Sequence, residues 1–291
     1  MAGLCDEVRA SCAAIAAGAR WVRIDPAALA HVDPGPAPQL DPVRHYLEGS
    51  PRDVATYMLC VDAVNFGSGW FPTLRKRAGC SGYFTVAWSI ADRFRAEGAW
   101  SAAQLRAMRA DEIAAVLGQE RDHELMALYA QALRDLGRFL GDGDALALVG
   151  LAQGSAQRLA AMLAAGMALF ADRGFYKRAQ IAPADLALAG VAEFRDLDRL
   201  TIFADNLVPH VLRCEGVLRY DDELAAQIDA GLLLAPGPRE REIRACAVHA
   251  CELIAARLGT TAHELDNALW TRGQAPEFKA VPRHRCRTVY Y

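Results

Sequence analysis

Two charged side chains interrupt apolar stretches in the second half of the chain. Lys177 lies in residues 175–181 and Asp205 lies in residues 200–210, and both segments are otherwise rich in apolar and aromatic side chains. An ion that leaves water without a partner loses roughly several kcal/mol, so it usually shifts its pKa or finds a counter-ion. We therefore predict that Lys177 and Asp205 meet in one functional site.

The same residues also have structural interpretations that their local sequence leaves open. Asp205 precedes Pro209 and can end a helix there, or it can pair with Arg213. Lys177 and Arg178 can form a basic pair on the surface, with the preceding aromatic residues in the core.

Residues 65–72 combine an amide, aromatic side chains and two glycines. Aromatic faces stack on flat heterocycles, and Asn65 can read hydrogen-bond donors and acceptors on a heterocycle's edge. We predict that Asn65, Phe66 and one of Trp70 or Phe71 form a pocket for a base. The alternative is a tight turn with its aromatic residues packed inward, because a G-x-G spacing alone is a weak motif.

Composition places the chain among ordinary globular proteins. It has 291 residues, 53% of them hydrophobic and 23% charged, with a net charge of −3. That balance predicts no general attraction to nucleic acid or to anionic membranes. The longest apolar run, residues 159–171, contains Gly166 and is shorter than the roughly 20 residues of a membrane span.

Cysteine usage and the N-terminus both favour a cytoplasmic protein. The eight cysteines are scattered without a C-x-x-C pair, which predicts free thiols in a reducing compartment. Neither they nor the histidines form a metal-binding pattern, so we expect no metal. Asp6 and Glu7 follow the start almost at once, which argues against a secretory leader.

Helical periodicity dominates the chain and predicts a mainly α fold with little or no sheet. Apolar stripes with helical spacing occupy residues 125–136, 159–170 and 243–254, and at least eight helices can be recognised. Capping-box patterns at residues 101–104 and 261–264 precede two further helices. Residues 83–88 fit either a short strand or the start of a helix.

The domain organisation that we predict is a single domain over residues 1–291. Prolines cluster in residues 31–42, which predicts an extended connector after an N-terminal helical segment. That segment is too short to hold its own core, so we expect residues 1–50 to pack on the main body.

Five segments together resemble the queuosine salvage family: residues 65–72, 175–181, 200–210, 267–270 and 287–291. The likeness is collinear from about Asp53 to the last residue. Members are N-glycosidases that release the base queuine from queuosine 5′-phosphate. The resemblance implies a cytoplasmic hydrolase with a small-molecule substrate and no cofactor, and no stable nucleic-acid partner. It also implies one helical globule similar in shape to the helical base-excision DNA glycosylases.

The resemblance further implies roles for individual residues. Asp205 would stabilise the positive charge that develops on the ribose as the base leaves. Queuine is a 7-deazapurine that lacks the nitrogen whose protonation usually helps a purine depart, so this carboxylate would carry more of the barrier. Lys177 would hold the phosphate, bind the ribose or keep Asp205 ionised. The remaining candidates are Gln180 and Phe203 for the base, and Arg178, Trp270, Arg287 and Tyr291 for the phosphate or ribose.

The sequence departs from the family directly after Asp205. Asn206, Leu207 and His210 stand where members more commonly have tyrosine, arginine and glutamine. If these neighbours tune specificity, the preferred base or phosphate state differs from that of typical members. Two other functions therefore stay open: hydrolysis of another modified purine nucleoside or nucleotide, and non-catalytic binding of a modified base.

Overall fold

The computed structural model describes residues 3–33, 35 and 39–291. In these residues the chain forms fifteen α-helices, three short 3₁₀ helices and one two-stranded sheet, so the predicted mainly α fold is confirmed. The first eight helices are α1 (Leu4–Ala17), α2 (Pro26–Leu29), α3 (Pro51–Ala63), α4 (Gly82–Glu97), α5 (Ala102–Ala107), α6 (Ala110–Leu117), α7 (Glu124–Leu140) and α8 (Ala145–Leu151). The others are α9 (Ala156–Gly166), α10 (Lys177–Leu188), α11 (Val208–Cys214), α12 (Asp222–Asp229), α13 (Pro238–Leu258), α14 (Ala262–Arg272) and α15 (Pro276–Ala280).

Local sequence signals explain where several helices begin and end. The capping boxes Ser101–Gln104 and Thr261–Glu264 start α5 and α14 as predicted. Residues 83–88 belong to α4, because the Ser81 hydroxyl accepts the N–H of Phe84 and caps a helix there. The apolar stripe over residues 159–170 is interrupted, since α9 ends at Gly166 and the chain continues in a 3₁₀ helix.

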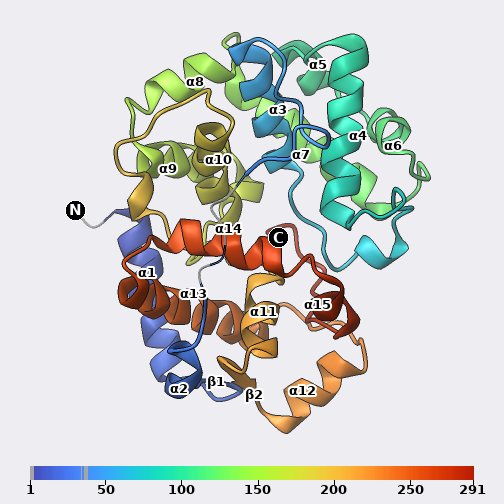
Figure 1. The fold of residues 1–291 in the computed structure, drawn as a ribbon. Helices are drawn as coiled ribbons and strands as arrows, with labels where there is room; N and C mark the ends of the chain where they lie inside the picture. Colours follow the sequence, from blue (N-terminus) through green and yellow to red (C-terminus); the bar gives the residue numbers. More distant parts are fainter. Residues whose placement is uncertain (1–2, 34, 36–38) are drawn as a thin grey trace.

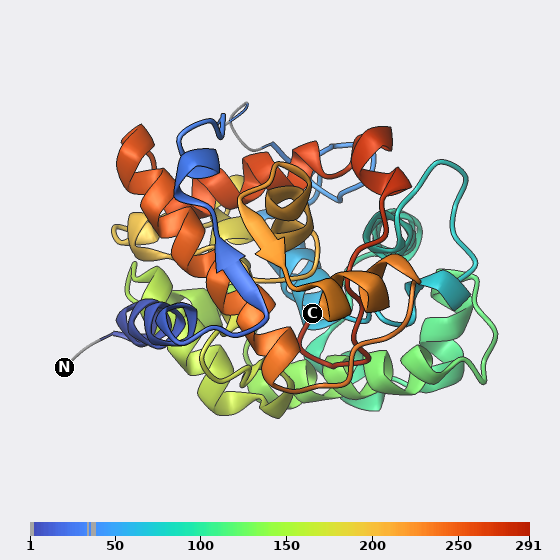
Figure 2. The same cartoon turned by 90° about the horizontal axis from the view of Figure 1, so that it is seen from below.

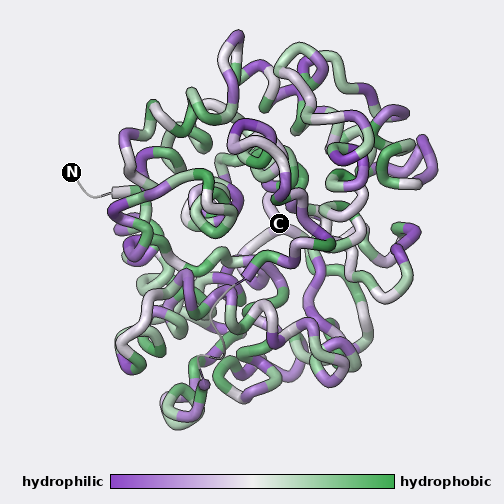
Figure 3. Tube along the Cα trace, turned by 45° about the horizontal axis from the view of Figure 1, so that its top comes forward, coloured by the Kyte–Doolittle hydropathy of each residue, from purple (hydrophilic) through white to green (hydrophobic). Residues whose placement is uncertain are grey.

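A small apolar cluster includes Leu200 and Phe203, and two large apolar cores make up the rest of the described interior. One lies among α3 to α10 and the other among α1 and α11 to α14, which Figure 1 shows as an upper and a lower group of helices. Colours in Figure 3 alternate along individual helices, as expected for helices that bury one side. The chain's last segment lies near the middle of the molecule, between the two groups (Figure 1).

The N-terminal segment is held on the second core. Helix α1 packs along α13, and β1 (Val22–Ile24) pairs antiparallel with β2 (Leu218–Tyr220), with Val22 opposite Tyr220. Figure 2 shows the two strands side by side. The Glu242 carboxylate accepts the N–H groups of residues 20–22 and so fixes the entry to β1. The predicted connector, residues 31–42, falls partly outside the described residues, at 34 and 36–38.

Candidate functional site

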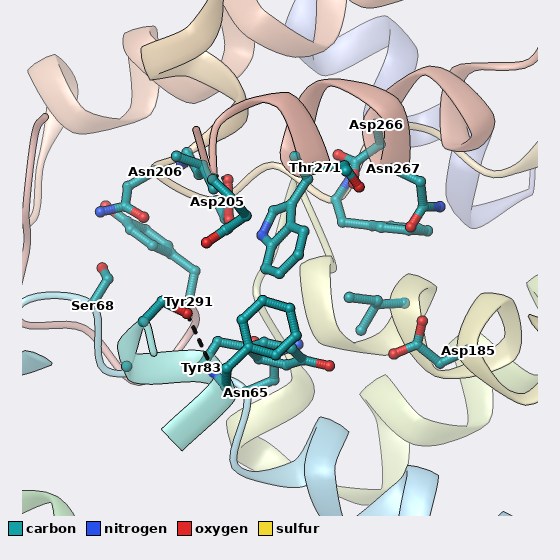
Figure 4. A pocket seen from close by; sticks show the side chains of 18 of the residues that line it. Asn65, Ser68, Tyr83, Asp185, Asp205, Asn206, Asp266, Asn267, Thr271 and Tyr291 are labelled. Carbon is teal, nitrogen blue, oxygen red and sulfur yellow. Dashed lines mark hydrogen bonds between the residues drawn. The ribbon is translucent and has the colours of Figure 1, made fainter. Parts of the chain in front are cut away.

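A cavity of about 330 Å³ lies between the two groups of helices. This volume is at the lower end of the range typical for small-molecule sites. Its wall comes from the connector before α3, the loop after α3, the N-terminal part of α4, α10, the segment before α11, α14 and the chain's last residues. Figure 4 shows how several of its polar side chains project into it.

Eight of the twelve predicted site residues line this cavity. They are Asn65, Phe66, Phe71, Lys177, Phe203, Asp205, Trp270 and Tyr291. Lys177 and Asp205 thus line the same cavity, as the prediction of a shared site requires. Of the two alternatives Trp70 and Phe71, it is Phe71 that lines the wall. The functional roles of these residues stay predictions.

Asp205 is fixed in the segment that leads into α11. Its carboxylate accepts the N–H groups of Leu207, at 2.7 Å, and Val208, at 3.1 Å. On the chain before it, the Ala204 carbonyl accepts from Arg244 Nε, at 2.8 Å. Asp205 therefore precedes the start of helix α11 and does not end a helix, which was one of its structural interpretations. Its carboxylate lines the cavity.

Lys177 begins α10 and is almost completely buried, with 4% of its surface exposed. Its Nζ donates to the Asn65 carbonyl at 2.9 Å, and no carboxylate in the described part of the chain lies within 4 Å of it. Burial lowers the pKa of Lys177 to about 8, and the neighbouring Asp205 is the largest opposing influence. The lysine is therefore charged at neutral pH but close to losing its proton.

The residue before Lys177 has an uncommon backbone. Tyr176 adopts the left-handed conformation, with φ 50° and ψ 40°, which non-glycine residues rarely do. Such conformations cost about 1–3 kcal/mol and cluster at functional sites. This turn directs the first residue of α10 toward the cavity.

Aromatic rings form much of the wall opposite these charges. Tyr83 and Phe84 at the start of α4 pack edge-on against Trp270 of α14, with ring centroids 5.3 and 5.6 Å apart. His45 Nε2 lies 3.1 Å from the Tyr83 hydroxyl. Flat rings around a narrow cavity suit a planar heterocyclic ligand.

A second carboxyl group lies close to Asp205. Asp266 of α14 is 4% exposed and accepts the Phe203 N–H at 2.9 Å. Burial, with the Asp205 carboxylate nearby, holds the pKa of Asp266 well above its usual range. The site thus contains two neighbouring carboxyl groups, and the environment of Asp266 favours its protonated form.

Four predicted site residues do not line the cavity: Trp70, Arg178, Gln180 and Arg287. Gln180 is fully buried and exchanges hydrogen bonds with Thr201, and Trp70 donates from its indole to Glu124, 2.6 Å away. Arg287 also pairs with Glu124, at 3.1 Å, and its guanidinium carbon lies 5.7 Å from the centroid of the Trp70 ring.

Arg178, predicted to contact the phosphate or ribose, is engaged in contacts within the protein. Its guanidinium lies between the rings of Phe66 and Phe170, 4.6 and 4.8 Å from their centroids. It donates to three carbonyl oxygens, including that of Val289 at 2.7 Å, and so anchors the tail that lines the cavity. Lys177 and Arg178 are neighbours in the sequence, yet only Lys177 lines the cavity.

Several cavity residues were missed by the sequence analysis. All are polar or charged: Asp185, Asp266 and Asn267 lie on helices, and Arg44, His45, Ser68 and Arg283 lie in the segments between helices. The capping box at residues 261–264 predicted α14, and residues 83–88 fitted the start of a helix, but neither pattern indicated which side faced a ligand. Arg283 belongs to the basic residues 283–287 near the end of the chain, of which only Arg287 was a predicted site residue.

The fold and the cavity together define a mainly α-helical protein with an internal site that combines aromatic faces, carboxyl groups and a buried lysine. Its relationship to known proteins is specific. The chain belongs to the family described as queuosine salvage protein, whose model matches residues 45–291. The match begins eight residues before the point at which the sequence likeness had been placed.

Similar proteins carry one shared name. A Sphaerobacter thermophilus protein named queuosine 5′-phosphate N-glycosylase/hydrolase is 34% identical over 279 residues, which cover 85% of this chain and 84% of that protein. Proteins of the same name from Mus musculus and Dictyostelium discoideum are 37% and 38% identical, over 40% of each chain.

Two kinds of feature, a membrane-spanning helix and a metal-binding cluster, are absent from the described residues. None of their helices combines the length and apolar character that a membrane-spanning helix requires. No group of three or more histidine, cysteine, aspartate or glutamate side chains within them is placed to hold a metal ion.

Proposed function

We propose that this protein is an N-glycosidase that hydrolyses queuosine 5′-phosphate to queuine and ribose 5-phosphate. The observation that carries the proposal is the Asp205 carboxylate, oriented by two backbone N–H groups in a cavity that also holds aromatic faces and a buried ammonium. Family membership and the printed names of similar proteins support the same activity.

The reaction breaks the bond between C1′ of the ribose and N9 of the base. Its electron pair leaves with the base, N9 gains a proton, and water adds its oxygen to C1′ and loses a proton. Asp205 stabilises the positive charge that develops on the ribose and accepts the water's proton. Lys177 and Asp266 both interact electrostatically with Asp205, and both carry protons that N9 can receive.

The phosphate contact that we now favour is Arg283. This residue lines the cavity, and no hydrogen bond or ion pair occupies its guanidinium in the described part of the chain. Asp205 influences its pKa, which burial lowers, so the two groups belong to the same end of the site. A phosphate dianion needs such a cation when it enters a partly buried site. The role of Lys177 is then to favour the ionised form of Asp205 through its positive charge.

Three further features belong to the proposal. We infer that residues 1–291 form a single domain, because the cavity wall draws on both cores. The substrate is a small molecule, in keeping with the cavity's volume. All eight cysteines are free thiols, which suits a cytoplasmic enzyme.

One assay separates the proposed function from its alternatives. The protein is incubated with queuosine 5′-phosphate, with queuosine and with tRNA that contains queuosine, and released base is measured by chromatography. We expect queuine from the 5′-phosphate and none from tRNA. Release only from other modified purine nucleotides would indicate a different specificity, and binding without release from any substrate would indicate a non-catalytic protein.

A further inference from the structure

One carboxyl group at the wall of the cavity and a second one buried behind it lack the backbone N–H donors that the other cavity carboxylates have. Asp41, Asp205 and Asp266 each accept at least one backbone N–H. Asp185 of α10 accepts no hydrogen bond from a backbone N–H, an amide, an alcohol or a basic side chain of the described protein, although it lines the cavity and is only 7% exposed. A buried carboxylate normally has its acceptors satisfied.

Asp62 of α3 lies behind Asp185 and has the same deficit. It is fully buried, and neither of its carboxyl oxygens has a partner among the described residues apart from the Asp185 carboxyl. Helices α3 and α10 pack together, so the two groups face each other across that contact. No cation forms an ion pair with either group within the described chain.

Burial raises the pKa of both carboxyl groups, and their proximity raises that of Asp62 further. The pair therefore shares a proton, which Asp62 keeps and donates toward Asp185. Lys177, at the start of the same helix as Asp185, lowers the pKa of both Asp62 and Asp185 and so favours their ionised forms. The outcome is a single negative charge on Asp185, facing the cavity.

The position of Asp185 separates it from the reacting end. It lies eight residues beyond Lys177, or about 12 Å along α10 at 1.5 Å per residue. Figure 4 shows Asp205, Asn206 and Ser68 on one side of the cavity and Asp185 and Asn267 on the other. A ligand whose ribose meets Asp205 thus presents a different part of its structure to Asp185.

We propose that Asp185, backed by Asp62, is the subsite for the protonated secondary amine in the side chain of the base. The inference rests on the proposed function, because queuine carries this amine between its 7-methylene group and its cyclopentenediol. A secondary ammonium supplies two N–H donors and one positive charge, which match the unoccupied acceptors and the negative charge of Asp185. The subsite selects 7-deazaguanines with a cationic side chain.

The test compares ligands that differ at this group alone. Binding of 7-aminomethyl-7-deazaguanine, which is cationic, and of 7-cyano-7-deazaguanine, which is neutral, is measured by calorimetry at pH 7.5 together with binding of queuine. The wild-type protein should bind the aminomethyl compound more tightly than the cyano compound. Asp185→Asn should weaken queuine and the aminomethyl compound by about 10- to 100-fold, the worth of one charge-assisted hydrogen bond, and change the cyano compound little.

A control variant and the wild-type comparison distinguish loss of the subsite from a general loss of binding. Asp142→Asn makes the same change on a fully exposed loop and should alter no affinity. Equal losses for all three ligands in Asp185→Asn, or wild-type preference for the cyano compound, would overturn the subsite. The wild-type comparison decides the matter even where the variant fails to fold. A protein that binds none of the 7-deazaguanines would instead contradict the proposed function.

Discussion

Arg283 and Arg287 are four residues apart, yet only Arg283 lines the cavity. Arg287 pairs with Glu124 on the exterior. We predict that Arg283→Met lowers kcat/KM for queuosine 5′-phosphate by about 10- to 100-fold, because a charge-assisted contact to the phosphate is lost. Affinity for queuine, which has no phosphate, should stay the same.

The matched control is Arg287→Met, which should change kcat/KM by less than about threefold, since exposed ion pairs contribute little. Steady-state kinetics and queuine calorimetry on both variants measure the difference. A larger loss in Arg287→Met than in Arg283→Met would contradict this assignment and favour Arg287, one of the cations predicted from the sequence, as the phosphate contact.

Lys177 is expected to reduce stability at neutral pH. Burial lowers its pKa to about 8, whereas the unfolded chain keeps an ordinary lysine pKa near 10.4. The unfolded state binds more protons between these values, so the cost is complete below pH 8 and fades toward pH 10.5. We predict that Lys177→Met raises the free energy of unfolding at pH 7 by up to about 3 kcal/mol, at 1.36 kcal/mol per pKa unit.

Urea denaturation at pH 7 and at pH 9.5 measures this effect. The gain should shrink at the higher pH, and Lys279→Met, on the exposed side of α15, should show neither the gain nor its pH dependence. A Lys177→Met protein less stable than wild type at pH 7 would contradict the account, as would an increase that is the same at both pH values.

At the scale of residues, sequence could identify the charges that interrupt apolar segments but not their partners. Lys177 and Asp205 stood out because their neighbours are apolar. Asp185 and Asp266 lie in helices where a polar residue every few positions is ordinary, so only packing shows which of them face the cavity. Arg178 seemed equivalent to Lys177, and the helix start turns it toward backbone carbonyls instead.

At the scale of elements, α13 connects the reacting segment to the second core. Arg244 on this helix is fully buried, pairs with Asp172 and Glu240, and donates to the Ala204 carbonyl next to Asp205. Removing one partner leaves the others buried without compensation, which costs about 3–5 kcal/mol. We predict that Arg244→Met lowers the free energy of unfolding by that amount and also lowers kcat.

Arg239→Met, on the same helix, is the control. Arg239 pairs with Glu223 at the surface, and its loss should cost less than about 1 kcal/mol. Chemical denaturation of both variants, with queuine release as the activity readout, provides the comparison. Equal destabilisation of the two variants would mean that the buried cluster does not hold the Asp205 segment.

Helices with an amphipathic stripe or a cap could be predicted from the sequence, and the small sheet could not. The stripes in α7 and α13 and the caps of α5 and α14 depend on neighbours three or four residues away. Strands β1 and β2 have three residues each and lie almost 200 residues apart. Nothing local encodes that pairing, which Glu242 fixes by accepting from the backbone before β1.

At the scale of the whole molecule, the cavity lies where the two cores meet. Its wall uses residues from both, and the tail that ends at Tyr291 returns from the second core so that Tyr291 O accepts the Gly67 N–H at 2.9 Å. We predict one cooperative unfolding transition for the full chain, because neither core can lose its structure without exposing the cavity.

Thermal unfolding followed by tryptophan fluorescence and by far-UV circular dichroism should give coincident midpoints. Queuine at 100 times its Kd should raise the free energy of unfolding by about 2.7 kcal/mol and shift both curves together. Two separate transitions, or a ligand shift seen by only one probe, would contradict the single-domain proposal.

The central claim is that the charge of Asp205 drives cleavage, and Asp205→Asn tests it most directly. The amide oxygen can still accept the Leu207 and Val208 N–H groups, so the segment that leads into α11 keeps both hydrogen bonds while the charge is lost. Single-turnover release of queuine from queuosine 5′-phosphate is measured beside the Kd of the same substrate. We predict a rate lower by about 10²- to 10⁴-fold with a Kd within a few-fold of wild type, whereas a variant that releases queuine at nearly the wild-type rate would contradict the account.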